Sequence, residues 1–128
     1  MSKQYTILIV LSLALLAACS MPPPTPPAGT RTVAELLADP VYDTEVRVYG
    51  RVSLLGELFC PCFELESGEK TVQVWYNLMV EDDGTEWPAA RIEGIANGDW
   101  VVVTGKLKPG GTHHSLNDFW ASAIEPAR

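Results

Sequence analysis

The chain has 128 residues and carries 16 acidic against 9 basic side chains, which gives a formal net charge of −7 at pH 7. A chain of this length is expected to form one domain. Proteins that bind nucleic acid neutralise its phosphates with basic surfaces, so this acidic balance excludes DNA and RNA as expected partners.

Residues 1–18 have the features of an export signal. Lys3 supplies a positive start, and residues 6–16 form an almost unbroken apolar run. That run is too short for a transmembrane helix, which needs about 20 residues. Small residues then precede a cysteine in the stretch Leu16-Ala17-Ala18-Cys19, which resembles the lipobox of bacterial lipoproteins.

The lipobox resemblance implies cleavage before Cys19, a thioether lipid on its sulfur and an acylated, palmitate-type N-terminus. Several acyl chains on one residue hold a protein stably at a membrane. Ser20 in the next position implies the periplasmic side of the outer membrane if the cell is Gram-negative. The expected location is the cell envelope; the alternative is an ordinary signal peptide followed by a chance cysteine.

Residues 19–31 are expected to be a linker, since they hold the lipidated cysteine and five prolines, Pro22, Pro23, Pro24, Pro26 and Pro27. The eleven residues 20–30 of this stretch favour polyproline II, which would hold the domain up to about 34 Å from the bilayer. Cleavage removes Lys3 and leaves 8 basic against 16 acidic side chains, so the mature chain is more acidic still.

Residues 32–128 are expected to form the domain. Thr32-Val33-Ala34-Glu35 has the form of a capping box and predicts a short helix over residues 33–37, before Pro40. Apolar alternation then predicts five strands, with a loop at residues 81–88 and one helical turn at residues 89–95. The predicted strands span about residues 44–54, 59–66, 71–77, 99–108 and 115–124.

The alternation also predicts which side chains face the core. In the first three strands the inward set is Val46, Val48, Gly50, Val52, Leu54, Phe59, Phe63, Leu65, Val72, Val74 and Tyr76. In the fifth strand the bulk comes from Phe119, Trp120 and Ile124. Gly50 and Gly105 stand at strand centres, where a missing side chain lets a strand bend sharply.

This order of features resembles an OB-fold: a short helix, the Val46–Val52 run around Gly50, a Phe63-Glu64-Leu65 strand, and the Gly98–Gly105 run. The resemblance is to small exported bacterial OB-fold proteins and, more distantly, to OB domains of the tRNA-anticodon type. It covers residues 32–125 and implies a mainly β domain, a five-stranded Greek-key barrel with a short N-terminal helix. Fold alone does not settle function.

Exported haem chaperones share this fold and use a histidine with a tyrosine four residues further on. Here the residues four beyond His113 and His114 are Asn117 and Asp118. The departure from the haem pattern counts against haem as a cofactor.

OB-folds bind on the outer face of the second and third strands and on flanking loops. In the expected register the ligand-binding face carries aromatic, basic and polar side chains, namely Arg47, Tyr49, Arg51, Glu64, Gln73 and Trp75. Such a face stacks on rings and pairs with carboxylates. The alternative is that Tyr49 and Trp75 merely cover the outside of the barrel.

Cys60-Pro61-Cys62 has three interpretations. Residues two apart in a strand have Cα atoms at about 6.6 Å, so a local disulfide is allowed in an oxidising envelope. The thiols could equally be idle. The third possibility is a metal site, in which Cys60 and Cys62 join His113 and His114 from the loop between the fourth and fifth strands to bind zinc or Cu(I).

No catalytic serine, phosphate loop or spaced carboxylate pair stands out, so an enzyme is not expected. The sequence therefore predicts a membrane-anchored, non-enzymatic binding module of the bacterial envelope that recognises a protein or glycan partner and needs no cofactor. The alternative is an envelope metal-binding or metal-delivery protein.

Overall fold

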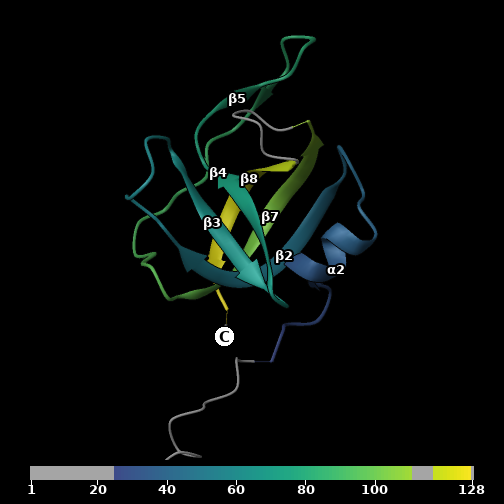
Figure 1. Cartoon of the computed structure of the whole chain (residues 1–128). Helices are drawn as coiled ribbons and strands as arrows, with labels where there is room; N and C mark the ends of the chain where they lie inside the picture. Colours follow the sequence, from purple (N-terminus) through teal and green to yellow (C-terminus); the bar gives the residue numbers. More distant parts are fainter. Residues whose placement is uncertain (1–24, 111–116, 128) are drawn as a thin grey trace, which may run out of the picture.

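The computed structural model describes residues 25–110 and 117–127. Within them the chain is mainly β, and the strands form a ring (Figure 1). The elements are β1 (Arg31–Thr32), α2 (Val33–Ala38), β2 (Glu45–Ser53), β3 (Cys62–Ser67), β4 (Lys70–Trp75), β5 (Met79–Val80), β6 (Glu86–Trp87), β7 (Trp100–Pro109) and β8 (Asn117–Pro126).

The ring arises because one sheet pairs with itself. Its strand order is β1-β2-β3-β4-β8-β7, and β2 pairs with β7 as well. The β2–β7 ladder is antiparallel and runs from Glu45 opposite Lys106 to Arg51 opposite Trp100. The β4–β8 pairing is parallel. Closure satisfies the backbone groups that an open sheet would leave on its edges.

The short helix α2 lies against β2 at one side of the ring (Figure 1). Thr32 and Glu35 form the capping box that the sequence predicts, and Val33 and Leu36 are fully buried. The Ser67 hydroxyl accepts a hydrogen bond from the Val33 amide at 2.7 Å and donates one to the Tyr49 carbonyl at 2.6 Å. This buried hydroxyl ties α2 to β2 and β3.

Most of the predicted inward set does form the core. Val48, Val52, Phe63, Leu65, Val72 and Val74 are buried there together with Val101, Val103, Leu107 and Phe119. Leu54 and Phe59 are the exceptions, and their assignment to the core is wrong. β2 ends at Ser53, Leu54 has a left-handed φ of 59°, and β3 begins only at Cys62. The alternation therefore stops before Leu54 and resumes after Phe59.

Gly105 marks a very close approach of two strands. A Cβ there would overlap the carbonyl oxygen of Trp120 and lie 2.7 Å from the ring of Phe119. The β7–β8 register shifts between Thr104 and Gly105, as at a β-bulge. The prediction of a strand-centre glycine that permits bending fits this geometry.

Two local predictions are wrong. Residues 89–95 form a turn at Gly94 and no helix, since Gly94 has a φ of 81°. The expected loop at residues 81–88 contains β6, which pairs with β5 as a small second sheet. That segment projects from one end of the ring (Figure 1). In the described part of the chain no helix is long and apolar enough to cross a membrane.

Candidate functional site

The outer face of β3, β4, β8 and β7 carries two rows of side chains. Strand register places Cys62 opposite Trp75, Trp75 opposite Trp120, and Trp120 opposite Lys106. The adjoining row is Glu64, Gln73, Asp118 and Lys108. Alternate residues of a strand share a face, so both rows lie on the outside of the ring. We call these two rows the outer band: Cys62 lies at its β3 end, and Lys106 and Lys108 lie at its β7 end.

Tyr49 and Trp75 do not present open rings on this surface. Their exposed fractions are 2% and 7%. The Tyr49 ring stacks on Trp100 with the centroids 5.0 Å apart, and burial raises the pKa of the Tyr49 hydroxyl. The expectation of exposed rings is therefore wrong, because Trp100, more than 50 residues away in sequence, covers Tyr49. The structure matches the alternative in which both rings cover the outside of the ring of strands.

The other predicted ligand-binding residues are more accessible. Arg51 is exposed and lies 3.7 Å from the Glu66 carboxylate, while exposed Arg47 donates to the carbonyl of Ala28 at 3.4 Å. Arg47 also lines a hollow of about 330 Å³ together with Gly29, Arg31, Glu45 and Val46. Glu64 and Gln73 stand directly opposite each other in the β3–β4 ladder.

Cys60 and Cys62 are joined by a disulfide, with their Cα atoms 5.2 Å apart. Cys62 is 1% exposed within β3, whereas Cys60 is partly exposed in the preceding loop. The Gln73 side-chain amide donates to Cys62 Sγ at 3.2 Å and to Cys60 Sγ at 3.7 Å. Of the three interpretations of this pair, the structure shows the disulfide.

A bond this local contributes little to the fold. The chain-entropy relation gives about 1.6 kcal/mol for a three-residue loop against about 3 kcal/mol for a loop of 15 residues. Six register pairs with β4 already hold β3 in place. The disulfide therefore shapes the end of the β2–β3 loop without cross-linking separate elements.

The metal hypothesis needs both cysteines as free thiolates, so it concerns the reduced protein. Its histidine ligands, His113 and His114, lie outside the described residues, as does Cys19. Among the described residues no three His, Cys, Asp or Glu side chains gather as a metal site. Zinc or copper binding stays a prediction.

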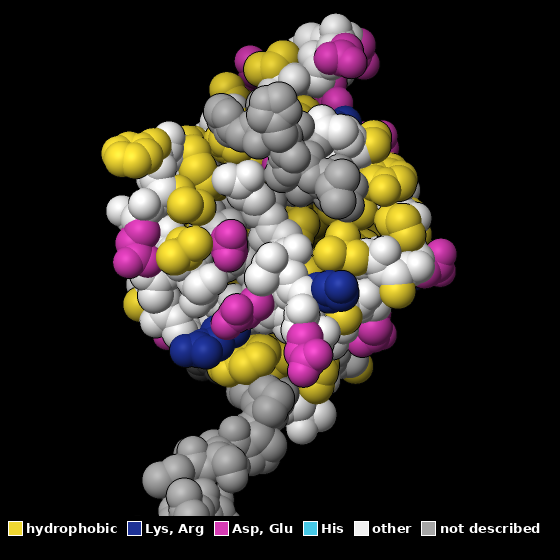
Figure 2. All heavy atoms as spheres, viewed as in Figure 1, with side chains coloured by type: hydrophobic (Ala, Val, Ile, Leu, Met, Phe, Trp, Pro, Cys, Tyr) yellow, Lys and Arg dark blue, Asp and Glu magenta, His cyan; other side chains and the backbone are white. Residues whose placement is uncertain are grey.

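The β2–β3 loop, residues 54–61, exposes large apolar side chains next to the disulfide. Phe59 is fully exposed, and Leu54 is 36% exposed. Figure 2 shows hydrophobic side chains standing out from the outline of the molecule at upper left, where this loop lies in Figure 1. Solvated apolar side chains of this size are recognition features in many proteins when they gather beside a polar rim.

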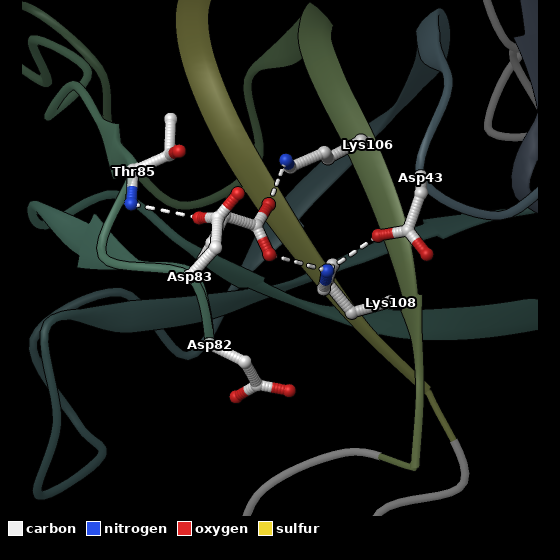
Figure 3. Close-up of a pocket in the computed structure, with 7 residues that line it drawn as sticks. Asp43, Asp82, Asp83, Thr85, Lys106 and Lys108 are labelled. Atoms are coloured by element: carbon white, nitrogen blue, oxygen red, sulfur yellow. Dashed lines mark hydrogen bonds and ion pairs between the residues drawn. The ribbon is translucent and has the colours of Figure 1, made fainter.

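A second feature lies at the lysine end of the outer band. The Glu81 carboxylate bridges Lys106 and Lys108, with 2.9 Å between Lys108 Nζ and Glu81 Oε2, and Lys108 also pairs with Asp43 (Figure 3). These residues line an open hollow of about 550 Å³ together with Asp82, Asp83 and Thr85. We call this group, Asp43, Glu81, Lys106 and Lys108, the lysine clasp.

Two tryptophans pack beneath the clasp. Lys106 Nζ lies 4.4 Å from the ring centre of Trp87, and Lys108 Nζ lies 4.7 Å from that of Trp120. The Trp87 indole donates to the carbonyl of Trp120 at 3.1 Å. Cation–π contacts of this kind contribute about 0.5–2 kcal/mol each, depending on how far the cation is desolvated. The β5–β6 segment is therefore fastened to the ring by both charge and ring contacts.

The charges of the clasp satisfy one another. Hydrogen bonds from Lys106 and Lys108 hold the pKa of Glu81 below its usual value. Burial opposes the charged form of Lys108, but its hydrogen bonds to Asp43 and Glu81 outweigh this and raise its pKa. Hydrogen bonds from Thr85 lower the pKa of Asp83 at the rim. A ligand would have to displace these internal pairs, so the hollow is better suited to structure than to recognition.

Sequence reasoning missed this clasp. Its available signal was Lys106 and Lys108, which alternate on the outer side of an otherwise apolar strand. Nothing local indicated that Glu81, about 25 residues earlier, reaches them.

A scan against models of known protein families finds no match, and a search of curated proteins finds no similar one. Among solved structures, an engineered protein, the OBody AM3L09 bound to hen egg-white lysozyme, is similar in fold. The similarity has a TM-score of 0.56 at 18% sequence identity, and it covers 80% of this chain and 98% of that one. The likeness concerns fold alone and supports a mainly β, OB-fold-like architecture.

Proposed function

We propose that residues 32–128 form a five-stranded OB-fold barrel with a short N-terminal helix, and that this domain is a non-enzymatic module of the bacterial envelope that binds a protein partner. The closed ring of β2, β3, β4, β8 and β7 and the likeness to the OBody support the fold. The lipobox-like stretch ending at Cys19 supports a lipid anchor at the membrane.

The observation that carries the binding proposal is the full exposure of Phe59 in the β2–β3 loop. OB-folds bind through the adjoining face and this loop. Aromatic anchors dominate the energetics of protein–protein interfaces, because they bury a large area at a small entropy cost. Leu54 in the same loop is 36% exposed, and Arg51, Glu64 and Gln73 supply polar side chains on β2, β3 and β4.

A protein partner fits this surface better than a glycan. Sugar rings are bound by stacking on exposed aromatic faces, and the two rings expected for that role, Tyr49 and Trp75, are buried. An isolated phenylalanine among leucines is suited to an apolar pocket of another protein. The OBody likewise is bound to a protein, lysozyme.

Site-specific photo-crosslinking in the cell envelope tests the proposal. A crosslinking amino acid at position 59 should yield a defined protein adduct, and one at position 69, in the exposed β3–β4 turn, should not. With the captured partner purified, Phe59→Ala should weaken binding by about 30-fold, the scale of an interface hot spot. Val80→Ala is the matched control, since Val80 is an apolar side chain that is 56% exposed in β5, and it should leave affinity unchanged.

The proposal fails if position 59 gives no protein adduct or if Phe59→Ala binds as tightly as the parent chain. Competition by purified envelope glycan at that position would replace the protein partner with a glycan.

A further inference from the structure

The disulfide between Cys60 and Cys62 is explained neither by partner binding nor by stability. The bond spans a single residue, and the strand it touches is already held on both sides, by β4 and by β2. We propose that Cys60–Cys62 is a thiol–disulfide exchange site that accepts two electrons from a protein dithiol, with Cys60 as the sulfur attacked. The site does not depend on the proposed partner binding at Phe59.

The two cysteines differ in exposure. Cys60 is partly exposed in the loop before β3, outside the β3–β4 ladder. Cys62 is 1% exposed and stands in that ladder opposite Trp75, which is itself buried. Exchange proceeds by in-line attack of a thiolate on a sulfur, and its rate depends on access. An incoming thiolate therefore reaches Cys60 and expels Cys62.

Gln73 is placed to receive the charge that this step creates. Its side-chain nitrogen donates to Cys62 Sγ at 3.2 Å and lies 3.7 Å from Cys60 Sγ. A thiolate is a stronger acceptor than a disulfide sulfur, since hydrogen bonds to an ionised group are stronger than those to a neutral one. The amide thus stabilises the leaving sulfur as it takes up the electron pair.

The exchange takes place in two steps. A partner thiolate attacks Cys60 Sγ, the Sγ–Sγ bond breaks, and its electron pair passes to Cys62 Sγ, which leaves a mixed disulfide on Cys60. The partner's second thiolate then attacks its own sulfur in that mixed disulfide and expels Cys60 as a thiolate. The partner ends as a disulfide, and Cys60 and Cys62 take up two protons from solvent to become thiols.

Exposed Phe59, the residue before Cys60, gives such a partner an apolar contact directly beside the attacked sulfur. The chemistry itself can be measured without that partner, because glutathione is a sufficient reductant. Failure of the exchange and failure of Phe59-dependent docking are therefore separate outcomes.

The first test is a redox titration of the full-length chain. The protein is equilibrated with about 10 mM reduced and about 0.1 mM oxidised glutathione, a buffer in which structural disulfides stay almost fully oxidised. Free thiols are then alkylated and counted in the tryptic peptide of residues 52–70, which holds Cys60 and Cys62 but not Cys19. The proposal expects at least half of the peptide to be doubly alkylated, and a smaller fraction overturns it.

The second test locates the attacked sulfur. In Cys62→Ser the remaining Cys60 should form a mixed disulfide with oxidised glutathione at least tenfold faster than Cys62 does in Cys60→Ser. Equal rates would overturn the assignment of Cys60. If a variant fails to fold, the titration of the unaltered chain still decides the proposal.

The role of Gln73 is tested in the rate at which reduced glutathione opens the disulfide. Gln73→Leu removes the donor to the leaving sulfur and should slow this reduction by about tenfold. Thr71→Val, at an exposed position on the same strand, is the matched control and should leave the rate unchanged. An unchanged rate in Gln73→Leu would remove Gln73 from the mechanism.

Discussion

Two segments outside the main ring of strands are held by different interactions. The β5–β6 segment, residues 79–87, is acidic and closes onto β7 through Glu81, whose carboxylate is shared by Lys106 and Lys108. The β2–β3 loop, residues 54–61, has no such charge pairs among the described residues. It is held by a local disulfide and by two hydrogen bonds between Asn97 and the Leu55 backbone, while Phe59 is fully exposed.

The difference separates structure from recognition. In the lysine clasp each charge has a partner within the chain, so the hollow offers a ligand little that is unsatisfied. In the β2–β3 loop the Phe59 side chain is fully exposed, and burying it against a partner would gain about 25 cal/mol per Å² of apolar surface. The β5–β6 segment, whose charges pair within the chain, therefore stabilises the domain, whereas the exposed apolar side chain of the β2–β3 loop is available to a binding partner.

Disrupting the β7–β8 contact within the ring of strands should have the largest effect on the free energy of unfolding. Gly105→Ala places a Cβ where the Trp120 carbonyl, the Phe119 ring and the Ala121 backbone leave no room. We expect a loss of about 3 kcal/mol or more in the free energy of unfolding, measured with urea, because backbone cannot move aside as a side chain can. Thr71→Ala at an exposed strand position should change it by less than about 0.5 kcal/mol. A loss below about 1 kcal/mol in Gly105→Ala would mean that the two strands can separate.

Breaking the clasp alone should have an intermediate effect. Glu81→Gln leaves Lys106 without a carboxylate at a side-chain exposure of only 12%, and it leaves Lys108 with Asp43 as its one described ion-pair partner. We expect a loss of about 2 kcal/mol in unfolding free energy, since a half-buried charge that loses its partner is costly. Glu86→Gln in the same segment is the control, because Glu86 is exposed and takes part in none of the described ion pairs. Equal losses in the two variants would show that the clasp is no stronger than surface charge.

Alternation in the sequence predicted the inner faces of the strands well, because a closed ring buries one side of every strand. It also predicted that Cys62, Glu64, Gln73 and Trp75 share the outer face of β3 and β4, but it assigned no outer face to β7 and β8. It could not predict what covers that face: Tyr49 is buried by Trp100, which reaches it through the β2–β7 pairing. The core assignment of Phe59 is wrong for a local reason. The left-handed turn at Leu54 takes the chain out of the sheet, although apolar residues continue in the sequence.

The candidate site was predictable only in part. Residues Cys60 and Cys62 were recognisable as a pair, but their spacing allowed a disulfide, idle thiols or metal ligands alike. The clasp depends on contacts of Glu81 across 25 and 27 residues, and a loop carboxylate gives no sign of its partner. Side-chain pairs of this kind are decided by the path of the loop, which periodicity does not encode.

The smallest expected effect is that of acid, which should destabilise the β5–β6 segment before it destabilises β3. The pKa of Glu81 is lowered in the folded state from an ordinary value of 4.5. Its contribution to stability is therefore complete above that value and is lost as pH falls through the lower folded-state pKa. The unfolding free energy should drop on acidification below about pH 4.5, and Glu81→Gln should show a shallower drop. In hydrogen exchange the amides of residues 79–87 should lose protection in this range before those of β3. Backbone pairing with β2 and β4 holds β3, and its described ion pair, Glu66 with Arg51, is exposed. Simultaneous loss in both segments would show that the clasp and the ring open as one unit.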